Sequence, residues 1–182
     1  MGLWIGLGVG GAVLLLLILM YNRLVRKRMK VRSNFEQIKV LAKKRFDLIP
    51  NLVAIVKGYA KHERELFDSV VAARNSGTSA GAPHDLAAAE AGLTNALGRL
   101  FALSEAYPDL KASTNFLSLQ GDLKDIEKAI SISRQIYNDS VMRYNAIIAT
   151  IPFNIVAGLF RFKSAQFYEI AKIETENVRI EF

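Results

Sequence analysis

The sequence contains no cysteine, and this absence removes several kinds of chemistry at once. A disulfide framework, a cysteine-based zinc site, a thiol nucleophile and a lipid-modified cysteine are all impossible without this residue. The two histidines are also uninformative, because His62 lies in a charged run and His84 in a low-complexity stretch. With no pair of histidines at metal-ligand spacing, the sequence predicts no metal ion and no other cofactor.

Charged side chains are missing from residues 1–22, and residues 12–20 consist almost entirely of Leu, Ile and Val. A run of about 20 apolar residues in a helix matches a hydrocarbon core of roughly 30 Å. Nothing basic precedes this run except the amino terminus, and no small-residue cleavage site follows it. We therefore expect residues 1–22 to form an uncleaved transmembrane anchor and not a signal peptide.

Acidic residues are missing before Glu36, whereas residues 23–34 form a basic collar. Its cationic residues are Arg23, Arg26, Lys27, Arg28, Lys30 and Arg32. We predict that they face anionic lipid headgroups and retain the following domain in the cytoplasm, leaving the N-terminus outside. Of the 24 Lys and Arg residues these six are in the collar, which leaves 18 against 17 Asp and Glu. This near balance argues against a nucleic-acid partner.

Small residues recur in the anchor at intervals of four, at Gly2, Gly6 and Gly10. On a helix these three lie on one face, and such a face allows two membrane helices to pack closely. The alternative is that glycine is simply frequent in membrane helices. The spacing is thus compatible with anchor packing between copies and does not require it.

The remaining residues, 35–182, show the three- and four-residue apolar steps of amphipathic helices and no alternation of period two. We predict one long helix from Phe35 with a kink at Pro50, a loop at 75–84, helices over 85–106 and 116–151, and a last helix from Ser164 to Ile173. The alternating steps over 116–148 are typical of a coiled-coil-like bundle seam. The predicted fold is all-α, with an N-terminal transmembrane helix followed by an antiparallel cytoplasmic bundle of about four long helices.

One point of this organisation stays open, namely how the anchor joins the bundle. No Gly or Pro occurs between Ala12 and Ile49, so nothing obliges the helix to stop at the membrane surface. The only restart signal is Ser33 to Glu36, an S-x-x-E capping box. A continuous helix would link anchor packing to the bundle, whereas a cap at Ser33 would make the anchor a loose tether.

Polar residues flank the predicted bundle seams and form the candidate site. Three of them, Gln120, Glu127 and Arg134, are seven apart, and Arg45, Asp47 and Asn51 surround Pro50. They could line a ligand-binding groove, but we favour a structural polar network that fixes helix register. Because seven residues of helix span about 10 Å, we expect Glu127 and Arg134 to pair with other helices more than with each other.

One segment matches a catalytic motif in its sequence but not in its predicted structural context. Residues 77–81 match G-x-S-x-G, but a nucleophile elbow needs a strand before it and a helix after it, and this segment is predicted to be a loop. We therefore predict no catalytic residues and no enzyme activity.

Several strings in the sequence resemble the LemA family. They are KRFDLIPNL at 44–52, VKGYAKHE at 56–63, YPDLKA at 107–112, Asn115-Phe116, Leu119-Gln120, and then Glu127, Ile130, Arg134, Tyr137-Asn138, Tyr144-Asn145 and Pro152. The resemblance implies a single-pass protein of the bacterial inner membrane, with an N-out anchor and a cytoplasmic helical bundle. It implies no enzyme activity and supplies no catalytic residues.

Two functional hypotheses follow. The first is a non-enzymatic, membrane-anchored scaffold that self-associates into a homo-oligomer and organises or remodels the inner membrane. The alternative is an adaptor or regulator of another membrane protein, such as a membrane protease or an envelope-stress component. The expected partners are an anionic lipid bilayer and further copies of the chain, with a second membrane protein under the adaptor alternative.

Overall fold

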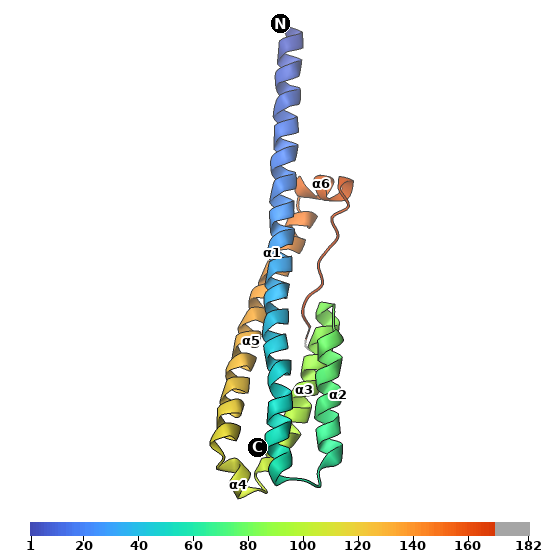
Figure 1. The fold of residues 1–182 in the computed structure, drawn as a ribbon. Coiled ribbons are helices and arrows are strands. Elements are labelled where there is room, and N and C mark those ends of the chain that lie inside the picture. Colours follow the sequence, from blue (N-terminus) through green and yellow to red (C-terminus); the bar gives the residue numbers. More distant parts are fainter. Residues whose placement is uncertain (170–182) are drawn as a thin grey trace, which may run out of the picture. The chain divides into compact units, whose positions relative to one another are not determined.

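The computed structural model describes residues 1–169, and all regular secondary structure in this part of the chain is helical. The helices are α1 (Gly2–Tyr59), α2 (Arg64–Ser79), α3 (Pro83–Ser104), α4 (Pro108–Lys111), α5 (Thr114–Ala149) and α6 (Phe153–Leu159) (Figure 1). The predicted all-α class is therefore confirmed. The chain divides into two compact units: unit 1 comprises Met1–Glu36 and Gln135–Gln166, and unit 2 comprises Gln37–Arg134 with residues 167–169.

Helix α1 runs without interruption from Gly2 to Tyr59 and passes through Ser33 and Pro50. The S-x-x-E sequence is therefore not used as a helix cap. A capping box needs a non-helical residue at its first position, whereas every residue before Ser33 back to Ala12 is compatible with a helix. The N-terminal part of α1 is long and apolar enough to cross a membrane, by its length and composition. Exposed leucines of this part are Leu7, Leu14, Leu15, Leu16, Leu17 and Leu19, as a lipid-facing surface requires.

Unit 2 is a helical bundle built from the C-terminal part of α1, from α2 and α3, and from most of α5. Helices α2 and α3 pack on each other and are joined by residues 80–82, so they are antiparallel (Figure 1). The three- and four-residue apolar steps put one face of each long helix into the core. Completely buried side chains are Ile49, Leu52 and Val56 of α1, Val70 of α2, Leu93 and Leu100 of α3, and Ile130 of α5.

The boundary between the first two bundle helices differs from the prediction. A single helix from Phe35 to the low-complexity stretch is wrong, because α1 ends at Tyr59 and α2 begins at Arg64. The apolar pattern does contain this break. Between the buried residues Ala60 and Leu66 lie five charged or imidazole side chains, so one helical turn would have had nothing to bury.

The predicted loop at 75–84 is also shorter in the structure, because α2 continues to Ser79 and α3 starts at Pro83. Two features make this polar stretch helical. The hydroxyl groups of Ser76, Thr78 and Ser79 donate to backbone carbonyls three or four residues earlier. Gly77 is buried, and a Cβ there would lie 2.6 Å from Cε1 of Phe46. Gly77 thus permits close packing on Phe46, and its stretch is not a flexible linker.

In unit 1 the segment after α6 is extended. The predicted helix from Ser164 is wrong over 164–169, which are not helical, and residues 170–173 lie outside the described residues. Helix α5 holds this segment through side chains. Tyr137 Oη donates to the carbonyl of Gln166 at 2.8 Å, and Tyr144 Oη donates to that of Lys163 at 3.0 Å. Asn145 exchanges two hydrogen bonds with the backbone of Ala165, at 2.9 and 2.8 Å.

Candidate functional site

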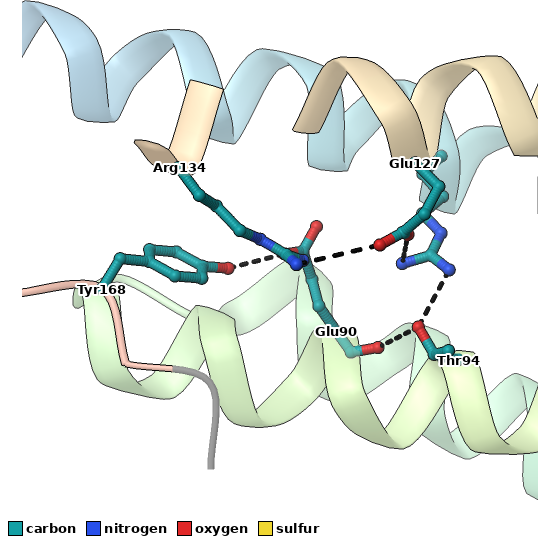
Figure 2. Close-up of polar contacts among 6 residues, drawn as sticks. Glu90, Thr94, Glu127, Arg134 and Tyr168 are labelled. Carbon is teal, nitrogen blue, oxygen red and sulfur yellow. Dashed lines mark hydrogen bonds and ion pairs between the residues drawn. The ribbon is translucent and has the colours of Figure 1, made fainter. Parts of the chain in front are cut away.

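A network of buried charges joins three helices of unit 2 (Figure 2). Arg45 comes from α1, Glu90 and Thr94 from α3, and Glu127 and Arg134 from α5, while Tyr168 lies in the extended segment after α6. Arg45 Nη1 lies 2.7 Å from Glu127 Oε2. Arg134 Nη2 forms a hydrogen-bonded ion pair with Glu90 Oε2, and Arg134 Nη1 lies 3.7 Å from Glu127 Oε1.

Two neutral residues complete the network. Tyr168 Oη donates a hydrogen bond of 2.6 Å to Glu90 Oε2, and its ring lies under the Arg134 guanidinium at 5.3 Å. Thr94 Oγ1 accepts from Arg45 Nη2 at 3.0 Å and donates to the Glu90 carbonyl at 2.9 Å. Glu90 therefore receives both a cation and a phenol, and the side chain of Arg45 is held from two helices.

Burial dominates the electrostatics of this network. Arg45 is 4% exposed and Glu90 is 1% exposed. Burial lowers the pKa of Arg45 against the opposing attraction of Glu127. Burial acts in the same direction on Arg134, but the ion pair with Glu90 outweighs it and raises the pKa. Burial first, and the negative charge of Glu90 second, raise the pKa of Tyr168 above its usual range.

The network is balanced in charge but not fully satisfied. Two guanidinium groups face two carboxylates, so the net formal charge is zero. Among the described residues, Glu90 Oε1 and the Nε atoms of Arg45 and Arg134 are buried without a hydrogen-bond partner. Arg45 Nη1 and Glu127 Oε2 lie close together as charges without meeting hydrogen-bond geometry. Such an arrangement is sensitive to the loss of any one member.

These positions suit a structural role better than a catalytic one. Glu90 and Tyr168 are almost completely enclosed, so a substrate has no access to them. Each carboxylate is already engaged by a cation of the network. Among the described residues there is also no group of three or more His, Cys, Asp or Glu side chains that could hold a metal ion. We interpret the network as the device that fixes the register of α1, α3 and α5.

The structure brings together half of the residues predicted for this network. Arg45, Glu127 and Arg134 meet, whereas Asp47 forms an exposed ion pair with Lys43 at 2.7 Å. Asn51 is exposed and Gln120 is half-buried, and neither contacts the network. As expected, Glu127 and Arg134 make their shorter contacts with other helices and only a 3.7 Å contact with each other.

Three members were not predicted, namely Glu90, Thr94 and Tyr168. Glu90 carried a usable signal, because it is the only charged residue within the alanine-rich stretch 87–91, on the apolar side of a helix. A lone acid at a buried position requires a cation from another element. Tyr168 gave no such signal, since its position depends on an extended segment that was predicted to be helical.

The predicted membrane-facing residues lie in unit 1. Gly2, Gly6 and Gly10 are exposed on α1, and a Cβ at any of them would meet nothing within 4 Å. In the collar, Arg23, Arg26, Arg28, Lys30 and Arg32 are exposed, and Lys27 is half-buried. Lys27 and Lys30 line a cavity of about 290 Å³ with Asn34 of α1 and with Asp139 and Arg143 of α5. Five of the six collar cations are thus exposed, and two collar lysines share a cavity with an acid of α5.

Comparison with known proteins identifies the family. The sequence model of the LemA family matches residues 34–182. This chain belongs to the LemA family. Many of the LemA-like strings have structural roles here: Arg45, Glu127 and Arg134 form the buried network, and Tyr137, Tyr144 and Asn145 hold the extended segment.

Three curated proteins are similar to this LemA-family chain. Magnetosome proteins MamQ 1 and MamQ 2 of Paramagnetospirillum magneticum (strain AMB-1) are each 25% identical over 179 residues, which cover 84% of this chain and 66% of each relative. Magnetosome protein MamQ of Magnetospirillum gryphiswaldense (strain MSR-1) is 28% identical over 163 residues, which cover 75% of this chain and 59% of the relative. The chain therefore spans less than two thirds of the length of these relatives.

Proposed function

We propose that this LemA-family protein is a non-enzymatic, membrane-anchored scaffold that self-associates and organises or remodels the inner membrane. The observation that carries the proposal is helix α1, which supplies both the apolar membrane stretch and one helix of the bundle without a break. Contact between the anchors of two copies therefore brings their bundles close together. The magnetosome names of the MamQ relatives are compatible with structural work in a cellular assembly, and they do not specify it.

The orientation in the membrane follows from the charge distribution. The positive-inside rule counts Lys and Arg near the ends of a membrane helix, and here all six collar cations lie on one side of the apolar stretch. We infer that the N-terminus faces away from the cytoplasm and that residues 35–182 lie within it. Each collar cation near an anionic leaflet contributes about 1 kcal/mol of attraction.

The exposed surface of the anchor is where self-association begins in this proposal. Gly6 and Gly10 lie on one face of α1 and have open space around them. Absence of side chains there lets two helices approach closely enough for backbone contact. Gly8 lies on another face of the same helix, because two residues correspond to about 200° of rotation.

Energy transfer between copies in vesicles tests this proposal. Donor- and acceptor-labelled full-length protein is co-reconstituted, and transfer is compared for the unmodified chain, Gly6→Leu with Gly10→Leu, and the matched control Gly8→Leu. We expect transfer to fall for the double variant and to persist for the control. A protein that is monomeric at every concentration would refute the scaffold, and equal transfer in all three forms would refute the glycine face as the contact between copies.

An adaptor role is the second candidate, and it is favoured by exposed apolar side chains in unit 2. Leu117 and Ile132 of α5 are each about half exposed, and such residues on a folded bundle can bind another protein. Crosslinking in cells separates the candidates, since a stoichiometric foreign partner indicates an adaptor and a ladder of self-products indicates a scaffold.

A further inference from the structure

The short helix α6 has one face that packs within unit 1. Val156 and Ala157 are buried in a cluster with Met20 and Leu24 of α1, and Phe153 and Phe162 pack against its edge. In Figure 1 α6 lies beside α1 and points away from it. Its packing partners on α1 are therefore a residue at the end of the apolar stretch, Met20, and one at the start of the collar, Leu24.

The opposite face of α6 is apolar and has no partner in the described structure. Ile155 and Leu159 on this face are 67% and 72% exposed. Ile151, just before the helix, is 76% exposed, and Phe160, just after it, is 52% exposed although its ring contacts Tyr21. Single exposed apolar residues are ordinary on protein surfaces, but a contiguous group of large ones marks a contact surface. The question is what covers this group.

The contacts of Tyr21 determine the depth of α6 relative to the membrane. Tyr21 stands where the apolar run of α1 ends, and tyrosine at this point of a membrane helix sits at the headgroup level. Its ring lies 4.7 Å from that of Phe160 and 5.8 Å from that of Phe162. A second contact between α1 and α6 lies nearby, since the Arg23 guanidinium lies 5.4 Å from the Phe153 ring. Both contacts hold α6 at the level where the bilayer ends.

The charge around α6 suits a phospholipid. A cavity of about 290 Å³ lies between α1 and residues 160–162, and its lining includes Arg28, Arg32, Tyr21 and Phe160. Two guanidinium groups beside aromatic rings complement an anionic headgroup with its attached chains. The backbone closes α6 at its C-terminal end. Arg161 adopts a left-handed conformation (φ 56°), and the N–H of Phe162 donates a hydrogen bond of 2.9 Å to the carbonyl of Ala157. This turn keeps the apolar side chains of α6 and those of the residues after it together.

We propose that α6 is an interfacial helix, and that Ile151, Ile155, Leu159 and Phe160 insert into the headgroup boundary of the leaflet that the collar faces, beside anionic phospholipid. This inference rests on the membrane anchor of the proposed function. A helix of seven residues binds a membrane weakly on its own. Here the anchor makes insertion intramolecular and raises its effective concentration. The helix thereby gives each copy a second point of attachment.

Site-specific fluorescence tests this inference in the full-length protein. Because the chain has no cysteine, one introduced cysteine carries an environment-sensitive nitrobenzoxadiazole probe without background. Probes at Ile155→Cys and Leu159→Cys replace exposed side chains, so the fold is preserved. Asp139→Cys, an exposed position on α5 of the same unit, is the matched aqueous control, and Leu14→Cys reports on the anchor. The protein is reconstituted at high dilution in vesicles of phosphatidylcholine and phosphatidylglycerol.

The readouts are the emission wavelength and quenching by lipids that carry a nitroxide near the headgroup. We expect probes at 155 and 159 to shift to the blue and to lose emission, and the probe at 139 to do neither. If the probe at Leu14 is shielded from water but those on α6 behave like the control, the interfacial helix is refuted while the anchor stands. If the probe at Leu14 is also in water, the anchor and this inference both fail. A blue shift without lipid quenching means that protein covers α6, which overturns the inference.

Discussion

Glu90 is the most deeply buried charged residue of the network. It is 1% exposed, pairs with Arg134, and accepts the hydroxyl hydrogen of Tyr168. Replacing it with glutamine keeps the shape of the side chain and removes its charge. The largely buried Arg45 and Arg134 would then share a single carboxylate, that of Glu127, whose side chain is 38% exposed.

The expected cost follows from these contacts. Removing one partner of a buried ion pair costs about 3–5 kcal/mol, and a retained neutral hydrogen bond to Tyr168 returns about 1 kcal/mol. We therefore expect Glu90→Gln to lower the free energy of unfolding by roughly 2–4 kcal/mol. At an m value of about 2 kcal/mol/M, this lowers the urea midpoint by about 1–2 M. The assay is urea unfolding of the detergent-solubilised protein, followed by helical circular dichroism.

A matched control exists on the surface of the same unit. Glu105 pairs with Lys111 at 2.5 Å, but its side chain is 63% exposed. Exposed pairs contribute about 0–1 kcal/mol, so Glu105→Gln should hardly move the midpoint. Replacing both members of the buried pair, with Glu90→Leu and Arg134→Met, should recover most of the loss because no uncompensated charge remains. Equal midpoints for Glu90→Gln and Glu105→Gln would refute the view that the network stabilises the bundle.

Two further predictions concern the same unit. The pKa of Tyr168 is raised in the folded state, so the unfolded chain loses this proton first, near pH 10, and the free energy of unfolding falls as the pH rises beyond that point. Tyr168→Phe should therefore flatten the decline of the unfolding free energy measured between pH 8 and 11. An unchanged slope would contradict the buried hydrogen bond to Glu90. At Gly77 a Cβ would meet the Phe46 ring, whereas at Gly92 it would meet nothing within 4 Å. Gly77→Ala should therefore lower the free energy of unfolding by about 1–3 kcal/mol, and Gly92→Ala, inside α3, should raise it by up to about 1 kcal/mol. The opposite order would count against the packing described for α2.

The part of the fold that depends on periodicity could be predicted from the sequence. The alternating steps over 116–148 predict one seam of α5, and Phe116, Leu123, Ile130, Tyr137 and Val141, which follow these steps, are all buried. Burial of an apolar stripe is a local property of a helix, so spacing alone reveals it. The helix boundaries were harder to predict. Ser33 carries a capping signal, but the helix continues through it. The polar stretch after Asn75 has the composition of a loop, but the contact of Gly77 with Phe46 keeps it helical.

The candidate site could be predicted only in part, for a different reason. Arg45, Glu127 and Arg134 were recognised because each is a charged residue beside an apolar seam. Their partners on α3 and after α6 depend on which helices meet, and this is a tertiary property. The repeated Tyr-Asn pairs at 137 and 144 show the same limit, since their extended partner segment was itself predicted to be a helix.

The distribution of compensated charge links the structure to the proposed role at the membrane. In unit 2, buried cations are neutralised by carboxylates of the same unit, as Arg134 is by Glu90. The first 35 residues contain no acid, Asp139 of α5 is an acid that shares a cavity with Lys27 and Lys30, and five of the six collar cations are exposed. A cluster of like charges is costly unless an outside anion reduces the repulsion. The exposed apolar face of α6 belongs to the same unit as this collar, and it likewise requires a partner, in its case an apolar one. A bilayer with anionic headgroups supplies both, and a soluble partner would have to supply an acidic and an apolar surface side by side at the same depth.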